Sequence, residues 1–461
     1  SNSSAASDVY KRQSQMSACA PLYEALMRHR QTEQVSLHMP GHKGRAGCLA
    51  PLGKLPIFDV TELPSTGSLF DAEGPTLLAE QAAAKAFGTA GTFFSAGGCT
   101  LCIQAMLRLA APLGGTVVMG RTVHRSAVHA MALLGITPIW VWPRQDAGPG
   151  LAGRIQADDV AKALQKHPDA KAVYLTTPDY YGVMSDLNAI CAAAQQYNVP
   201  VIVDNAHGAH LFFLDRKLHP LSQGAAMCAD SAHKTLPVLT GGAYFQIGSG
   251  RYLPQVRAAM ALFGSTSPSF PILLSLDLCR AWLEEEGKAA YAKTAAQANE
   301  LNAYAQTLGF LPPEGLCDPL HLVWNTAHAG VSGKRAALHL RSAGIEVEYA
   351  DEAFLILLLS PFNTEKDFAQ LRAALTTMPV GEPFSPSSLL PAPPPIAASP
   401  REALLSPRVR LPLCMAQGRI AAQTACPCPP AIPAIMPGER ITPECADLLA
   451  QSGILEIEVV K

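Results

Sequence analysis

The sequence lacks a strong excess of charge of either sign. Lysine and arginine number 35 and aspartate and glutamate 37 in 461 residues, a formal net charge of −2. Nucleic-acid-binding proteins need a basic surface, so this balance argues against DNA or RNA as a partner. Charged residues make up only 16% and hydrophobic residues 49%, which excludes a disordered chain and indicates a globular protein of two or three domains.

Long apolar runs and a signal-peptide pattern are also missing, so we expect no membrane partner. The 12 cysteines are scattered, which favours a reducing, cytoplasmic location. The close pairs Cys99–Cys102 and Cys426–Cys428 lack further ligands at zinc spacing, so we expect free thiols and no metal. Residues 1–13 differ in character from the remainder, and we interpret them as a leader of non-native origin.

Short apolar runs alternate with helical patterns in the first half of the chain. The runs lie at residues 116–120, 138–142, 171–177 and 199–204, with helical patterns between them at 126–134, 157–166 and 187–197. Continuous apolar strands separated by helices predict an α/β fold with a mostly parallel sheet covered on both faces.

The second half of the chain reads differently. A long helical region extends to about Leu308, and the residues beyond it predict a smaller α+β domain that includes the strand-like run "IEVEYA". The proline-rich stretch 379–400 can continue neither a helix nor a central strand. We therefore divide the chain into an N-terminal segment (14–50), a large domain (51–290), a small domain (291–378), a linker (379–400) and a C-terminal domain (401–461).

Polar clusters follow several predicted strands, where ligands of parallel sheets collect. "SAGGCT" (95–100) opens a helix, and its backbone amides can face a phosphate, although tight turns need glycine as well. Asp204 ends a buried strand and either caps the next turn or holds a proton on a heteroaromatic nitrogen. His124 either stacks on a flat ring or caps the next helix.

Lys234 lies in "SAHKTLP", just after the strand-like run "AMCAD". Most lysines are solvated surface residues, and without further evidence we would interpret Lys234 as one of them. An acid at one strand end and a lysine near the next is, however, the arrangement that pyridoxal phosphate needs. The lysine forms a Schiff base with the cofactor, and the acid keeps its pyridine nitrogen protonated. Hydroxyl and imidazole groups beside the lysine can donate to a phosphate, so the clusters together predict a pyridoxal-phosphate site.

At this point the chain resembles the Orn/Lys/Arg decarboxylase family of fold-type-I pyridoxal-phosphate enzymes, in the short form without an N-terminal wing domain. The matching motifs, in family order, are "HMPGHKGR", "FFSAGGCT", "RTVHRS", "TTPDYYG", "VDNAHGAH", "DSAHKTLPVLTGGAYF", "STSPSF", "GIEVEYAD" and "PPAIPAIMPGERIT". They span nearly all of the chain from about residue 20. The resemblance implies an aspartate-aminotransferase-like large domain, a small α+β domain and a C-terminal domain of this family's type.

The resemblance also implies roles for individual residues. Lys234 would carry the cofactor, Asp204 would pair with the pyridine nitrogen, and His124 would stack on the ring. His207 would lie near the phenolic oxygen, and Lys234 or His233 would return a proton to Cα. The phosphate would be held by Gly98, Cys99, Thr100, Ser231 and His233 and, across a homodimer or larger homo-oligomer, by the partner's Ser265 or Thr266.

The implied reaction is decarboxylation of lysine, arginine or ornithine to the corresponding polyamine-pathway amine and CO2, and the residues do not choose among these substrates. One alternative is an aminotransferase or another lyase, although no arginine that would clamp an α-carboxylate stands out. Another is a catalytically weak homologue that binds the cofactor and has a regulatory or structural role. Retention of Lys234, Asp204 and His124 argues against that alternative.

Several positions depart from the family pattern. Cys99 replaces a common hydroxyl and Asn205 a common glutamate, while Gln423 and Cys428 replace an acid and an aromatic residue near the C-terminus. If that acid reads the substrate's distal cation, Glu348 and Asp351 are alternative candidates, although a charged strand end also explains them. We further expect Lys234 to lie in a desolvated pocket, which would lower the pKa of its amine.

Overall fold

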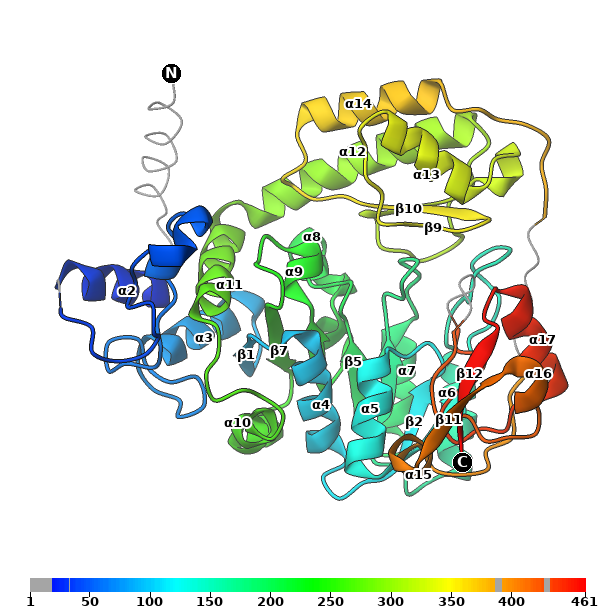
Figure 1. Cartoon of the computed structure of the whole chain (residues 1–461), viewed down its shortest axis with the longest axis horizontal. Helices are drawn as coiled ribbons and strands as arrows, with labels where there is room; N and C mark the ends of the chain where they lie inside the picture. Colours follow the sequence, from blue (N-terminus) through cyan, green and yellow to red (C-terminus); the bar gives the residue numbers. More distant parts are fainter. Residues whose placement is uncertain (1–18, 33, 386–391, 427–431) are drawn as a thin grey trace.

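The structure is a computed structural model that describes residues 19–32, 34–385, 392–426 and 432–461 (Figure 1). The interpretation of residues 1–13 as a leader and the departure at Cys428 fall outside the described residues. Among the described helices, none combines the length and the apolar character that crossing a membrane requires.

A seven-stranded sheet forms the centre of the large domain, in the order β1-β7-β6-β5-β4-β2-β3. Neighbouring strands pair in parallel except β7, which is antiparallel to both β1 and β6. This confirms the predicted, mostly parallel sheet. The strands are β1 (Gly91–Ser95), β2 (Gly115–Gly120), β3 (Ile136–Val141), β4 (Val173–Thr176), β5 (Val201–Asp204), β6 (Met227–Asp230) and β7 (Ala243–Ile247).

Helices cover both faces of this sheet, and this explains why its inner strands read as continuous apolar runs. Helices α4 (Gly98–Ala110) and α5 (Arg125–Leu134) belong to the apolar core on one face. Helices α6 (Ala157–Lys166) and α7 (Leu187–Gln195) belong to the core on the other face. Strands β4 to β7 are almost completely buried as a result.

The connection from β6 to β7 decides where Lys234 lies. It contains only the one-turn helix α9 (Ala232–Thr235) and a glycine turn. A parallel crossover usually contains a full helix, and this connection (residues 231–242) has none, so the chain returns as an antiparallel strand. Lys234 is therefore held at the carboxyl edge of the sheet, beside the end of β5.

The small domain lies over this edge at the top of Figure 1. Its antiparallel sheet has the order β8-β10-β9, with β8 (His321–Asn325), β9 (Tyr349–Ala350) and β10 (Phe354–Leu358). The run "IEVEYA" gives only the two-residue β9, because the amide of Ile345 instead donates to the carbonyl of Leu340 at the end of a helix. The helices are α12 (Lys288–Thr307), α13 (Gly333–Ser342) and α14 (Glu365–Thr376).

The remaining elements comprise further helices of the first 290 residues and the C-terminal unit. Helices α2 (Pro21–Gln31) and α3 (Gly74–Phe87) precede the sheet, while α8 (Leu211–Leu214), α10 (Val256–Ala261) and α11 (Phe270–Trp282) follow β5. The C-terminal unit contains α15 (Pro400–Leu405), β11 (Arg408–Pro412), α16 (Leu413–Ala416), α17 (Pro443–Gln451) and β12 (Glu456–Val460).

Arg121 attaches the C-terminal unit to the end of β2. Its guanidinium is fully buried and donates to the two carboxylate oxygens of Glu439 at 2.5 and 2.8 Å. It also donates to the carbonyl of Pro433 at 3.1 Å and lies over the rings of Trp140 and Trp142. Two of the motifs that carry the family resemblance, "RTVHRS" and "MPGERIT", thus meet in one buried ion pair.

Candidate active site

A cavity of about 440 Å³ lies at the carboxyl edge of the parallel strands, where ligands of such sheets bind. The predicted site residues that line it are Gly98, Cys99, Thr100, His124, Asp204, His207, Ser231, His233 and Lys234. Ser265 and Thr266 are exposed and do not line this cavity. The chain therefore brings together every predicted residue except the two assigned to a partner subunit.

Lys234 projects from α9 into the cavity. Its Nζ lies 3.0 Å from Nε2 of His207, and the hydroxyl of Tyr291 donates to the neighbouring carbonyl of Thr235 at 2.7 Å. The lysine is exposed in the single chain, so the expectation of a desolvated lysine is wrong for one subunit by itself.

Asp204 lies at the end of β5 and is 1% exposed. One carboxylate oxygen accepts from the amide of Ala206 at 3.2 Å, and the other accepts from the hydroxyl of Tyr174 at 3.2 Å. Burial raises the pKa of Asp204, and the positive charge of Lys234 opposes this shift. The carboxylate does cap the local turn, as one reading of the sequence had it, and it also faces the cavity.

Tyr174 is a site residue that sequence reasoning missed, because it lies within an apolar strand and looks like core. Replacing it by phenylalanine removes a donor from Asp204 and should weaken pyridoxal-phosphate binding by about 5- to 10-fold, the value of one buried hydrogen bond. Fluorescence titration of the apoprotein measures this. Tyr244→Phe is the matched control, since that hydroxyl donates to the carbonyl of Leu276 and also contacts Cys279, but not Asp204; an equal loss in both variants would contradict the prediction.

One of the backbone amides predicted to face a phosphate already has a partner within the protein. The amide of Gly98 donates to the carbonyl of Gly241 at 2.8 Å, so it is already used within the protein. Gly98 provides the turn, with φ of +68°, and Cys99 and Thr100 in the first turn of α4 line the cavity, where a helix has unbonded amides. Ser231, 1% exposed, lies 3.4 Å from Nδ1 of His233 through its hydroxyl and completes this donor set.

His124 caps the next helix, which is one of the two interpretations that the sequence left open. It is the N-cap of α5, where its Nδ1 accepts from the amide of Ser126 at 3.3 Å. Its ring also lines the cavity. Partial burial and then the positive charge of Lys234 lower the pKa of His124 to about 4, so the ring is neutral at neutral pH.

The departure at Asn205 has a structural reason. Its Nδ2 donates to Asp230 at 2.6 Å, and the other oxygen of Asp230 accepts from Gln246 at 3.1 Å and contacts His219 at 3.2 Å. A glutamate at position 205 would place two carboxylates in contact in a fully buried site. Asparagine at this position therefore matches the aspartate that it faces.

Among the alternative acids, Asp351 is used within the fold, since its carboxylate accepts from the amides of Ala353 and Phe354 at 2.8 Å each. Glu348 accepts from the hydroxyl of Tyr180 at 3.3 Å, and Tyr180 lines the cavity. Of these two acids, Glu348 is therefore the one that contacts a residue of the cavity lining, Tyr180. Gln423 is half-buried in the C-terminal unit and does not line the cavity.

Asp179, in the "TTPDYYG" motif, lines the cavity and was given no role from the sequence. Burial raises its pKa from about 3.8 to about 6, although its carboxylate accepts from the amides of Tyr181 and Val183. The folded state therefore binds more protons than the unfolded state between these pH values, and its stability falls as pH rises through this window. Asp179→Asn keeps both amide bonds, so we expect it to raise Tm more at pH 8 than at pH 4.5. An equal change at both pH values would contradict this.

The comparisons with known proteins agree with the fold and the site. The model of the Orn/Lys/Arg decarboxylase major domain matches residues 20–309, and the model of the family's C-terminal domain matches residues 391–451. The chain is 32% identical to the uncharacterized protein YaaO of Bacillus subtilis over 94% of both chains. It is also 32% identical to the arginine decarboxylase of the same organism, over 92% of this chain and 91% of that one.

A solved structure confirms the architecture. The lysine decarboxylase LdcF of Francisella novicida superimposes with a TM-score of 0.82 at 18% identity, over 97% of this chain and 82% of that one. At this identity the likeness shows a shared fold, that of the fold-type-I pyridoxal-phosphate enzymes. With family models that together match most of the sequence, the chain belongs to the Orn/Lys/Arg decarboxylase family.

Proposed function

We propose that this protein is a pyridoxal-phosphate-dependent decarboxylase that releases the α-carboxylate of a basic amino acid as CO2. The observation that carries the proposal is the convergence of a lysine, a buried acid and a helix N-terminus on one cavity. Lys234, Asp204 and the first turn of α4 fit the carbonyl, the pyridine nitrogen and the phosphate of the cofactor.

The protein's own groups would prepare the reaction. When bound, pyridoxal phosphate supplies an electron sink that allows the bond between Cα and the carboxylate to break heterolytically. Asp204 holds a proton at the pyridine nitrogen, which requires an ionised carboxylate beside that atom. His124 presents a flat, neutral ring to the cavity. Lys234 and His233, which both line the cavity, are our candidates for returning a proton to Cα.

Arginine is the substrate that we propose to test first. The relative named arginine decarboxylase aligns over more than nine-tenths of both chains, whereas the lysine decarboxylase structure shows a likeness of fold alone. The product would then be agmatine, an amine of the polyamine pathway. Glu348 is our candidate for the acid that reads the distal cation, through its contact with Tyr180.

We further propose that the working form is a homodimer or a larger homo-oligomer in the cytoplasm. Three features support a partner subunit: Lys234 is open to solvent, Ser265 and Thr266 lie outside the cavity of their own chain, and Leu37 is 89% exposed. The buried thiols of Cys99, Cys102, Cys228 and Cys279 suit a reducing compartment.

Identification of the amine tests the substrate assignment. Purified holoenzyme is incubated separately with arginine, lysine and ornithine, and agmatine, cadaverine and putrescine are measured by chromatography. We expect agmatine to form fastest. Cadaverine or putrescine as the main product would move the assignment to lysine or ornithine, and no amine from any of the three would overturn the proposed reaction.

A further inference from the structure

A line of buried polar groups leads from Lys234 into the small domain. Nδ1 of His207 lies 3.4 Å from Nε2 of His321, and Nδ1 of His321 lies 2.7 Å from Oδ2 of Asp318. Oδ1 of Asp318 accepts from the amide of Leu320 at 2.9 Å and contacts Nε2 of His210 at 3.0 Å. All four side chains of this relay (His207, His210, Asp318 and His321) are more than nine-tenths buried.

The ionisation of Asp318 decides which ring nitrogens of this relay carry a hydrogen. Burial by itself would raise the pKa of Asp318, but His210 and His321 outweigh it and hold this pKa well below its usual range. An ionised carboxylate only accepts, so His321 donates from Nδ1, and the neutral tautomer that this bond selects has its lone pair at Nε2. His207 then donates from Nδ1, which leaves the lone pair of its Nε2 facing Lys234.

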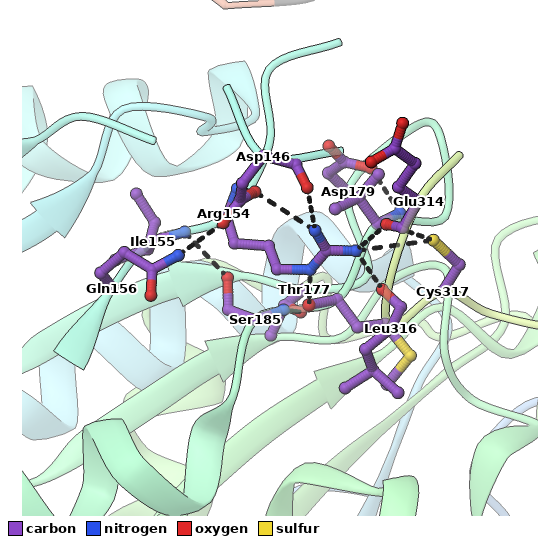
Figure 2. Close-up of polar contacts among 12 residues, drawn as sticks. Asp146, Arg154, Ile155, Gln156, Thr177, Asp179, Ser185, Glu314, Leu316 and Cys317 are labelled. Atoms are coloured by element: carbon purple, nitrogen blue, oxygen red, sulfur yellow. Dashed lines mark hydrogen bonds and ion pairs between the residues drawn. The ribbon is translucent and has the colours of Figure 1, made fainter. Parts of the chain in front are cut away.

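Hydrogen bonds attach the segment that carries Asp318 to the large domain. Arg154 donates to the carbonyls of Glu314 and Leu316 and also to the carbonyl of Met184 (Figure 2). The amide of Asp318 donates to the carbonyl of Gly182 at 2.8 Å. These contacts hold the acid of the relay at a fixed place relative to the loop that follows β4.

The absence of a side chain at Gly182 leaves space for His321. A Cβ at this position would lie 2.7 Å from the Cβ of His321, and φ of +73° is strained for any other residue. The last glycine of "TTPDYYG" is thereby explained by the relay and not by the cavity itself.

We propose that Asp318 and His321 are positioning residues that fix one tautomer of His207, whose Nε2 then accepts a hydrogen bond from Lys234. The proposal rests on the role of Lys234 in the proposed function and adds how its amine is oriented. With the bond in this direction, the lone pair of the neutral amine stays free to react with the cofactor's carbonyl.

Asp318→Asn is a sharp test, because the structure dictates how the new amide must lie. The amide of Leu320 donates to Oδ1, so this atom must remain an oxygen. The new NH2 group therefore takes the place of Oδ2 and donates to Nδ1 of His321. The relay reverses, and His207 presents an N–H to Lys234 that occupies the amine's lone pair.

Two measurements report this reversal. Nitrogen NMR of the ¹⁵N-histidine-labelled apoprotein should show His207 protonated at Nδ1 in the wild type and at Nε2 in the Asp318→Asn variant. After pyridoxal phosphate is added to the apoprotein, the visible absorbance of the lysine-bound cofactor should develop about 10²-fold more slowly in the variant. An unchanged tautomer, or an unchanged rate in a folded variant, would overturn the proposal.

A pair of substitutions at His321 separates orientation from packing. Glutamine can still accept from Nδ1 of His207, whereas leucine cannot, so His321→Gln should keep the rate within about 3-fold and His321→Leu should lose about 10²-fold. His219→Gln is the control, because His219 is equally buried beside Asp230 but does not touch His207. Equal losses in all three variants would mean that only packing matters.

The failure of this proposal is distinguishable from failure of the proposed function. If Lys234→Ala still formed the absorbance of a covalently bound cofactor, the role of Lys234 would be wrong. If Lys234→Ala abolished that absorbance and Asp318→Asn left its rate unchanged, the role of Lys234 would stand and the relay would not.

Discussion

Lys234→Ala is expected to abolish the visible absorbance of a covalently bound cofactor and to lower the decarboxylation rate by at least about 10³-fold. The physical reason is that alanine has no amine to bind the cofactor's carbonyl, while Asp204 and the donors of α4 remain in place. The cofactor should therefore still bind, but without a covalent bond. Absorbance spectra and mass spectrometry after borohydride reduction measure the difference directly.

The control for this variant is Lys334→Ala, which truncates a lysine in the same way at an exposed ion pair with Glu352. It should keep the spectrum and the rate of the wild type. Thermal unfolding of both variants checks that the fold is intact. A borohydride-stable adduct in Lys234→Ala, or turnover near the wild-type rate, would show that another residue holds the cofactor.

Glu439→Ala is expected to lower the free energy of unfolding by about 3–5 kcal/mol. The substitution leaves the guanidinium of Arg121 buried without a counter-charge and removes the acceptor for the amide of Met436. Because Arg121 directly follows β2 and begins the loop that carries His124, the loss should also disturb that side of the cavity. Denaturant unfolding followed by fluorescence measures the change.

Two further variants test the explanation of this loss. Glu346→Ala breaks an exposed pair of the same chemistry with Arg341 and should lower the free energy of unfolding far less than Glu439→Ala does. The double substitution Arg121→Met and Glu439→Leu removes both charges and should be less destabilised than Glu439→Ala alone. If Glu439→Ala cost no more than Glu346→Ala, the ion pair would not be what attaches the C-terminal unit.

Much of the fold could be predicted from the sequence, because buried parallel strands produce continuous apolar runs that need no distant information. The same logic placed Lys234 and Asp204 together, since both follow strands whose carboxyl ends meet at one edge of the sheet. The apolar residues of β7 look the same for either strand direction, so the sequence does not reveal that this strand is antiparallel. This direction follows from the lack of a full helix in the connection after β6.

The parts of the site that were missed depend on packing between distant segments. His321 lies 114 residues from the histidine that it contacts and belongs to another domain, and Glu439 lies 318 residues from Arg121. Tyr174 was hidden in an apolar strand in which only its hydroxyl has a polar role. The exposure of Lys234 was not foreseen either, because it depends on what covers the cavity and not on the residues around the lysine.

Carboxyl-labelled substrate provides the most direct test of the reaction. The holoenzyme is incubated with [1-¹⁴C]arginine, with the lysine and ornithine analogues in parallel, and released CO2, amine and keto acid are measured in one sample. We predict one CO2 for each amine formed and no keto acid. Keto acid without CO2 would show an aminotransferase, and a cofactor-loaded protein that yields neither product would contradict the assignment as a decarboxylase.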